Sequence, residues 1–149
     1  MKKLEKYLNI GWDFDDTLID HPNSVKMWDF IDHNPYGQKH HLITFRSGGL
    51  ENRIFGDLAV RGSILIESHF ENVFNIDHQV WIDFQTIEPK LILSLDDLKD
   101  DPYLNWKGEI CYAHGIEVLI DDMTFNVLPG CQRHGIDYIH PNDLLDDSQ

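Results

Sequence analysis

The sequence predicts an α/β fold, a three-layer α/β/α sandwich with a central parallel sheet, and three observations predict it. The chain has 149 residues, of which 42% are hydrophobic, enough for the core of one domain spanning residues 1–149. Five short apolar runs stop abruptly at polar residues, as strands buried on both faces do. Stretches of helical length separate most of these runs. This alternation favours βαβ units with right-handed crossovers.

Most of the predicted strands are followed directly by polar side chains of the kinds that act in catalysis or metal binding. They cover residues 8–12, 41–43, 80–82, 117–120 and 136–139, and the first four are followed by Asp13, Thr44, Asp83 and the pair Asp121-Asp122. In an open α/β sheet, ligands bind at the carboxyl ends of the strands. We therefore expect several carboxylates and one hydroxyl to gather at one edge of the sheet.

The predicted helices cover residues 24–33, 49–60, 103–114 and 124–134. Asn34-Pro35 ends the first, because a residue before proline disfavours the helical region. Gly115 is a good left-handed cap for the third. Pro129-Gly130 indicates a kink or a break inside the fourth. Residues 63–77 fit either a strand plus a helix or a small insertion.

Charge and composition exclude several classes of function. Lys and Arg number 12 against 26 Asp and Glu, which gives a net charge of −14, so nucleic acid and anionic membranes are disfavoured as partners. No apolar run is long enough for a membrane span, and the first residues are not followed by a signal-peptide core. Two cysteines, Cys111 and Cys131, are too few for a disulfide framework. We expect a cytoplasmic protein.

Three acids lie within four residues directly after the first predicted strand: Asp13, Asp15 and Asp16. Burying them together is costly unless a cation is present, and a hard divalent ion such as Mg²⁺ accepts oxygen ligands. An Asp at a strand end can also act as a nucleophile towards phosphorus. The alternative is a solvated Asp-rich turn. A calcium loop is disfavoured, because Leu18 occupies the position where that loop needs Gly.

Four motifs occur in the order found in one enzyme superfamily. Residues 12–18 (WDFDDTL) resemble the first motif of the haloacid dehalogenase (HAD) superfamily of phosphotransferases, and Ile43-Thr44 resembles the second. Lys107 matches the lysine of the third motif, and Ile120-Asp121-Asp122 resembles the acidic fourth. Residues 105–122 look much like the corresponding stretch of small 5′-nucleotidase-like members. The resemblance implies a Rossmann-like HAD fold and an enzyme that hydrolyses phosphate monoesters.

The resemblance also implies catalytic and phosphate-binding roles. Asp13 would attack phosphorus and become a transient aspartyl-phosphate, while Asp15 would protonate the leaving oxygen and later activate water. Thr44 would hydrogen-bond a phosphoryl oxygen. Lys107 would offset negative charge on the phosphate and the nucleophile.

The implied cofactor is Mg²⁺. Its ligands would be the Asp13 carboxylate, the backbone carbonyl of Asp15 and an acid of the fourth motif. Asp122 is the expected direct ligand there, while Asp121 would orient Lys107 or a metal-bound water.

Two basic residues leave alternatives open. Lys90 competes with Lys107 for the third-motif role, although the apolar run that follows Lys90 does not lead into the fourth motif as a helix would. Arg46, two residues after Thr44, is suited to binding a substrate anion and equally to a surface salt bridge.

The segment between the first two motifs, residues 18–40, is too short for a large cap domain. Residues 85–104 have room for a small extra element. We therefore expect an open site that accepts a bulky phosphorylated substrate or is covered by a second copy of the chain.

The leading hypothesis is a Mg²⁺-dependent phosphatase for small phosphorylated substrates, with nucleotides as candidates. Two alternatives remain. A non-catalytic phospho-receiver domain also gathers Asp, Thr and Lys, but there the acidic pair precedes the lysine. A polynucleotide-end phosphatase would need a basic groove, against which the net charge of −14 counts.

Overall fold

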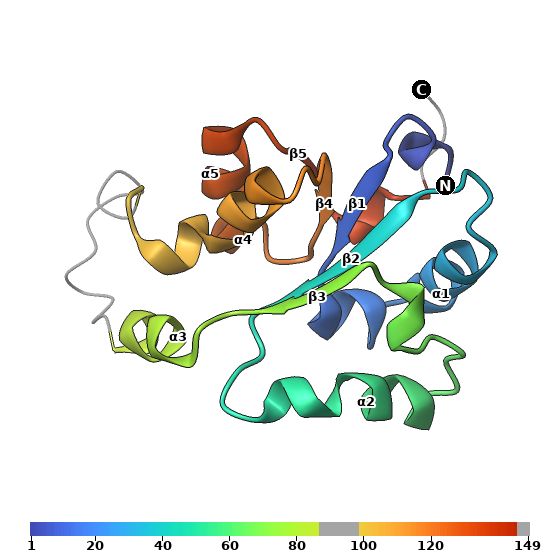
Figure 1. The fold of residues 1–149 in the computed structure, drawn as a ribbon, viewed down its shortest axis with the longest axis horizontal. Helices are drawn as coiled ribbons and strands as arrows, with labels where there is room; N and C mark the ends of the chain where they lie inside the picture. The colour runs from blue at the N-terminus through green and yellow to red at the C-terminus, as the bar shows by residue number, and fades with distance from the viewer. Residues whose placement is uncertain (87–98, 146–149) are drawn as a thin grey trace.

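A five-stranded parallel sheet forms the centre of the molecule (Figure 1). The computed structural model describes residues 1–86 and 99–145. The strands are β1 (Asn9–Trp12), β2 (Lys39–Thr44), β3 (Asn72–Asn75), β4 (Val118–Ile120) and β5 (Asp137–Ile139), in the order β3-β2-β1-β4-β5. Every neighbouring pair is parallel. The carboxyl ends of all five strands therefore meet at one edge.

Helices cover both faces of this sheet, which confirms the predicted three-layer α/β/α sandwich. In Figure 1, α1 and α2 lie on one face, and α4 and α5 lie on the other. The helices are α1 (Ser24–His33), α2 (Ile54–Val60), α3 (His78–Gln85), α4 (Pro102–Ala113) and α5 (Thr124–His134). Short helical turns cover Lys2–Leu4, Phe14–Leu18, Leu50–Arg53, Glu67–His69 and Pro141–Asp143.

Successive strand residues point to opposite faces and fill two separate cores. Leu42 of β2 packs in the cluster that contains the apolar residues of α1 and α2. Its neighbour Ile43 packs with Leu119 of β4 and with the inner residues of α4 and α5. Because both faces are buried, these strands read as short continuous apolar runs rather than as alternating patterns.

Helices α4 and α5 approach each other closely at a pair of glycines. A Cβ atom added to Gly108 would lie 2.3 Å from the backbone carbonyl carbon and oxygen of Gly130. Only hydrogen fits there, so the backbones come together without an intervening side chain. This contact fixes the position of α4 and with it Lys107, which precedes Gly108.

Most predicted elements are confirmed. Helices 24–33 and 124–134 have the predicted bounds, and Pro129 lies inside α5 without ending it. Gly115 takes the left-handed conformation expected of a cap, with a φ of 69°. The predicted helix 49–60 is divided between the turn at Leu50–Arg53 and α2.

The predicted strand at residues 80–82 is wrong, because these residues lie inside α3. The third strand is instead β3, within the stretch 63–77 that the sequence left ambiguous. Val80, Trp81 and Phe84 pack together against the core, and this i, i+1, i+4 spacing is helical. The Asp77 carboxylate caps the helix by accepting hydrogen bonds from the backbone N–H groups of Gln79 and Val80.

No large cap is inserted between β1 and β2, where the chain forms only the turn at Phe14–Leu18 and helix α1. The predicted element at residues 85–104 lies largely outside the described residues, and Lys90 lies wholly outside them. Within the described ranges, no helix has the length and apolar character that crossing a bilayer requires.

Candidate active site

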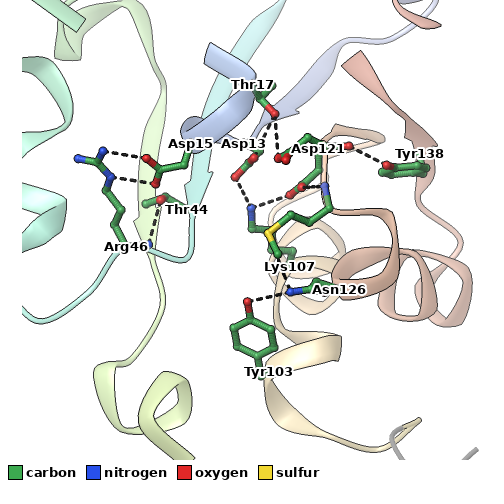
Figure 2. Close-up of polar contacts among 12 residues, drawn as sticks. Asp13, Asp15, Thr17, Thr44, Arg46, Tyr103, Lys107, Asp121, Asn126 and Tyr138 are labelled. Carbon is green, nitrogen blue, oxygen red and sulfur yellow. Dashed lines mark hydrogen bonds and ion pairs between the residues drawn. The ribbon is translucent and has the colours of Figure 1, made fainter. Parts of the chain in front are cut away.

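The turn after β1 places two aspartates on opposite sides of the sheet edge. The Asp13 backbone N–H donates to the Ile120 carbonyl at 2.9 Å, which ties the end of β1 to β4. Asp15 has an extended backbone, and Asp16 is left-handed with a φ of 58°. In Figure 2 the Asp13 side chain points towards Lys107, and the Asp15 side chain points away from it towards Arg46.

Lys107 is completely buried between two carboxylates. Its Nζ donates to Asp13 Oδ1 and to Asp121 Oδ2, both at 2.7 Å (Figure 2). The ammonium also lies 4.3 Å from the centre of the Phe45 ring, within range of a cation–π interaction. One positive charge therefore faces two negative charges in a site from which water is largely excluded.

Burial sets the electrostatics of this group. Desolvation raises the pKa of Asp13 and the pKa of Asp121 well above their usual range, although Lys107 opposes both shifts. The two carboxylates in turn raise the pKa of Lys107 despite its burial. Desolvation raises the pKa of Asp122 as well. The group lacks positive charge, which a divalent cation would supply.

Asp13, Asp121 and Asp122 form the candidate metal centre. Each offers one carboxylate oxygen, and the three oxygens lie within 4.8 Å of one another. An all-oxygen donor set of this kind suits a hard cation such as Mg²⁺. The Thr17 hydroxyl lies between two of the acids, 3.1 Å from Asp13 Oδ2 and 3.4 Å from Asp122 Oδ1.

The two acids of the Asp121-Asp122 pair differ in how they are used. Asp121 Oδ2 accepts from Lys107, and Asp121 Oδ1 accepts from the Met123 backbone N–H at 2.8 Å. Its backbone carbonyl accepts from the Tyr138 hydroxyl at 2.6 Å. Asp122 is only half-buried; it accepts a long hydrogen bond from the Thr17 hydroxyl and lies next to Asp13. This geometry favours Asp122 as the direct metal ligand and Asp121 as the residue that orients Lys107.

Thr44 ends β2 and is buried at the same edge. Its Oγ1 accepts a hydrogen bond from the Arg46 backbone N–H at 3.0 Å. Because the hydroxyl oxygen is used as an acceptor, the hydroxyl proton remains for donation to an anion.

Arg46 holds Asp15 through a two-point ion pair. Nε donates to Asp15 Oδ2 at 2.9 Å and Nη2 donates to Asp15 Oδ1 at 2.8 Å (Figure 2). Nη1 donates to Asp57 Oδ2 at 2.7 Å. The guanidinium group also lies 4.6 Å from the centre of the Phe14 ring. Planar bidentate pairing fixes the orientation of a carboxylate. Of the two alternatives for Arg46, the structure therefore shows an ion pair, made within the site.

The predicted edge residue Asp83 does not join this group. It lies on α3, where its Oδ1 accepts from Gln79 Nε2 at 2.7 Å. Its place in the prediction rested on the strand at 80–82, which the structure replaces with a helix. The chain that follows β3 instead supplies a cavity wall.

A cavity of about 460 Å³ opens beside Asp13 and Asp15. Besides these acids and Asp16, it is lined by Phe45, Arg46, Ser47, Gly48, Leu50, His78, Trp81, Gln85, Tyr103 and Met123. Sequence reasoning missed the contribution of α3. The feature of the sequence that could have revealed it is the spacing of His78, Trp81 and Gln85, which places them on one face of a helix.

Comparison with known proteins supports the fold. No family model matches the chain, and no curated protein is detectably similar to it. The core domain of a suggested phosphoglycolate phosphatase from Streptococcus pneumoniae has a TM-score of 0.48 at 16% identity, over 91% of this chain and 80% of that one. An uncharacterized protein from Corynebacterium glutamicum has a TM-score of 0.51 at 13% identity, over 90% of this chain and 84% of that one. The second similarity supports a shared α/β fold.

Proposed function

We propose that this chain is a Mg²⁺-dependent phosphatase of the HAD superfamily, which hydrolyses phosphate monoesters through an aspartyl-phosphate on Asp13. The observation that carries the proposal is the buried Lys107, held between Asp13 and Asp121 beside a third acid, Asp122. Asp13 directly follows β1, Lys107 lies on α4, and Asp121 and Asp122 directly follow β4. The four sequence motifs occur in the order of that superfamily.

The reaction needs positive charge near the phosphoryl oxygens, and the site has acidic residues that could hold a cation to supply it. Phosphate-monoester hydrolysis is among the slowest uncatalysed reactions, and its catalysis rests on positioning and on neutralising charge at the phosphoryl oxygens. Asp13, Asp122 and the Asp15 carbonyl would hold Mg²⁺. The ion would supply the charge that lets a phosphate dianion approach these carboxylates.

The chain's own residues then perform two steps. An Asp13 carboxylate oxygen forms a bond to phosphorus while the bond to the leaving oxygen breaks, and Asp15, in its protonated form, gives its proton to that oxygen. Asp15 next takes a proton from water, which attacks phosphorus and releases inorganic phosphate from Asp13. Thr44 donates to a phosphoryl oxygen, and Lys107 offsets the charge on the nucleophile.

The cavity of about 460 Å³ suits small phosphorylated compounds, and nucleoside monophosphates are the candidate substrates. A second copy of the chain would serve as a cover for so open a site. The buried free thiols of Cys111 and Cys131 support a reducing cytoplasm as the place of the reaction.

The Asp13→Asn variant tests the nucleophile. It removes the attacking oxyanion with little change in shape, so kcat should fall by about 10³-fold or more while the circular dichroism spectrum is unchanged. Asp20→Asn, the same substitution at a surface ion pair with Arg61, is the matched control. Residual activity above a tenth of wild type would exclude Asp13 as the nucleophile. A stable phosphorylated form of the wild-type protein, without turnover, would instead support the phospho-receiver alternative.

A further inference from the structure

The cavity beside the candidate active site has one wall made by α3. His78, Trp81 and Gln85 occupy positions i, i+3 and i+7 of this helix, and all three line the cavity. Asp15, the proposed proton donor to the leaving group, lines the same space. The part of the substrate that departs from phosphorus therefore faces this wall.

The cavity floor is built from stacked aromatic rings. Phe45 follows Thr44 directly and stacks on Tyr103 with ring centres 4.3 Å apart, and Tyr103 stacks on Phe84 at 4.1 Å. Figure 2 shows Tyr103 below Lys107 on α4. Trp81 is only partly buried, and its ring is nearly parallel to that of His78. An aromatic surface thus extends from the proposed phosphate position to a half-exposed tryptophan.

Aliphatic side chains at the rim add to this apolar surface. Leu50 is 53% exposed and Met123 is 44% exposed, and both line the cavity. A bound apolar group would remove them from water. The volume of about 460 Å³ is within the range of pockets that hold small organic ligands.

The charges of the described residues around the cavity disfavour a second anionic group on the substrate. Arg46 is paired with Asp15 and Asp57, and Lys107 is paired with Asp13 and Asp121. Among the described residues that line the cavity, Arg46 is the only Lys or Arg, whereas the Asp16 carboxylate also lines it. A carboxylate or second phosphate on the leaving group would face negative charge without an available partner.

The wall is pre-formed and carries polar groups at its edge. The Ser47 hydroxyl lies 2.8 Å from His78 Nδ1, which ties the loop after β2 to α3. Gly48 packs against the same ring, since a Cβ there would lie 2.6 Å from His78 Cε1. The exposed Gln85 amide forms no side-chain hydrogen bond to any described residue, so it can donate to and accept from a ligand.

We propose that the leaving group of the substrate carries an uncharged planar ring that stacks on Trp81. This inference rests on the proposed phosphatase function and names its substrate class. Nucleoside monophosphates and aryl phosphates share the required chemistry. Trp81 is then a specificity-determining residue, and Gln85 hydrogen-bonds polar groups on the ring edge.

A matched pair of substrates isolates the ring. Adenosine 5′-monophosphate and ribose 5-phosphate have the same leaving oxygen and sugar and differ by the base. The ratio of their kcat/KM values should be about tenfold or more in favour of the nucleotide. In Trp81→Ala this ratio should fall by about tenfold, and in Trp81→Phe, which keeps a ring and the packing of α3, it should fall less. Tyr112→Ala, which removes an exposed ring of α4 that lines a different cavity, should keep the wild-type ratio.

A second comparison identifies the source of the ring. Phenyl phosphate attaches the ring directly to the leaving oxygen, so a preference for it over the nucleotide that depends on Trp81 would support an aryl phosphate. Ribose 5-phosphate hydrolysed as well as both ring substrates, or a ratio unchanged in Trp81→Ala, would overturn the inference while leaving the phosphatase proposal intact.

Binding of a compound that cannot be hydrolysed tests the ring site independently of the phosphatase proposal. Adenosine lacks the phosphate, and its dissociation constant, measured by calorimetry, should rise about tenfold in Trp81→Ala. Binding of this kind by a protein that hydrolyses no phosphate ester would support the ring site and contradict the phosphatase. Absence of adenosine binding in the wild-type protein, together with phenyl phosphate hydrolysis that does not depend on Trp81, would overturn the ring site.

Discussion

At the scale of single residues, the site is organised by Lys107. Burying an ammonium and two carboxylates is costly, and the pair contacts at 2.7 Å offset that cost only because all three groups are held in place. Phe45 covers the ammonium, and Met123 and Tyr138 fix Asp121. This arrangement holds the Asp13 carboxylate in one orientation.

A second buried titratable residue makes stability depend on pH. His40 Nδ1 accepts from Trp12 Nε1 at 2.9 Å, and its Nε2 lies 3.1 Å from Asn34 Oδ1, so the ring is neutral with its proton on Nε2. Burial lowers the pKa of His40 from 6.5 to about 4. Between these values the unfolded chain binds the proton and the folded protein does not. The free energy of unfolding should therefore fall as pH drops from about 6.5 to about 4, by about 3 kcal/mol from this residue.

Urea unfolding at pH 7 and pH 4.5 measures this effect. His40→Gln, which removes the titrating group and keeps an acceptor, should lose less stability on acidification than the wild-type protein. The exposed His33 provides the control, since His33→Gln should keep the wild-type pH dependence. Equal losses in His40→Gln and wild type would contradict the assignment.

The sequence predicted most of the residues that gather at the sheet edge, with Asp83 as the wrong one, but it did not predict all their contacts. Asp13, Thr44 and Asp121 end apolar runs, and the parallel sheet does bring them together. Lys107 could be matched by spacing and motif alone. The ion pair of Arg46 with Asp15 could not be predicted, because it depends on the direction of the turn after β1 and on the left-handed Asp16.

At the scale of elements, the packing of α4 on α5 controls the site. Gly108 lies next to Lys107 in the chain and meets the backbone of Gly130. Any displacement of α4 moves the ammonium relative to Asp13 and Asp121. The Pro129 ring inside α5 does not prevent this close approach.

Gly108→Ala should therefore both destabilise the protein and reduce activity. Its Cβ would lie 2.3 Å from backbone atoms that cannot rotate away, so α4 and α5 must separate at a cost of about 1–3 kcal/mol or more. Gly56→Ala is the matched control in α2, where a Cβ meets nothing within 4 Å, and should stabilise by up to about 1 kcal/mol. Urea midpoints that move alike in both variants would contradict this account.

Helix α3 shows why part of the site escaped prediction. Val80-Trp81-Ile82 is a short apolar run, and periodicity alone does not distinguish a buried strand from a helix over three residues. Only the added position of Phe84 and the cap by Asp77 favour a helix. Because this element was predicted as a strand, its cavity-facing residues His78, Trp81 and Gln85 went unrecognised.

At the scale of the whole molecule, the net charge of −14 sets how the protein responds to cations. Acidic side chains are spread along the chain, but the described structure brings one carboxylate oxygen from each of three of them within 4.8 Å of one another. Monovalent salt screens all of these charges together. A divalent ion bound at one place acts on the folded state alone.

Millimolar Mg²⁺ should therefore raise the melting temperature. A ligand at 100 times its dissociation constant stabilises the folded state by about 2.7 kcal/mol, which corresponds to about 5–10 °C for a chain of this size. Differential scanning fluorimetry against NaCl of equal ionic strength measures the shift. Asp122→Asn should remove most of it, while Asp83→Asn, the same charge change on α3, should not. An equal shift in both variants would show nonspecific screening instead of a site.

The central place of β1 in the sheet has a consequence for how the protein is made. On the ribosome, β1 finds its first neighbour, β2, early, but its other edge must wait until Val118–Ile120 has emerged. Until then the nascent chain displays an open strand edge that can pair wrongly. Asp13 and Thr44 are synthesised long before Lys107 and Asp121. The candidate active site can therefore assemble only late in the synthesis of the chain.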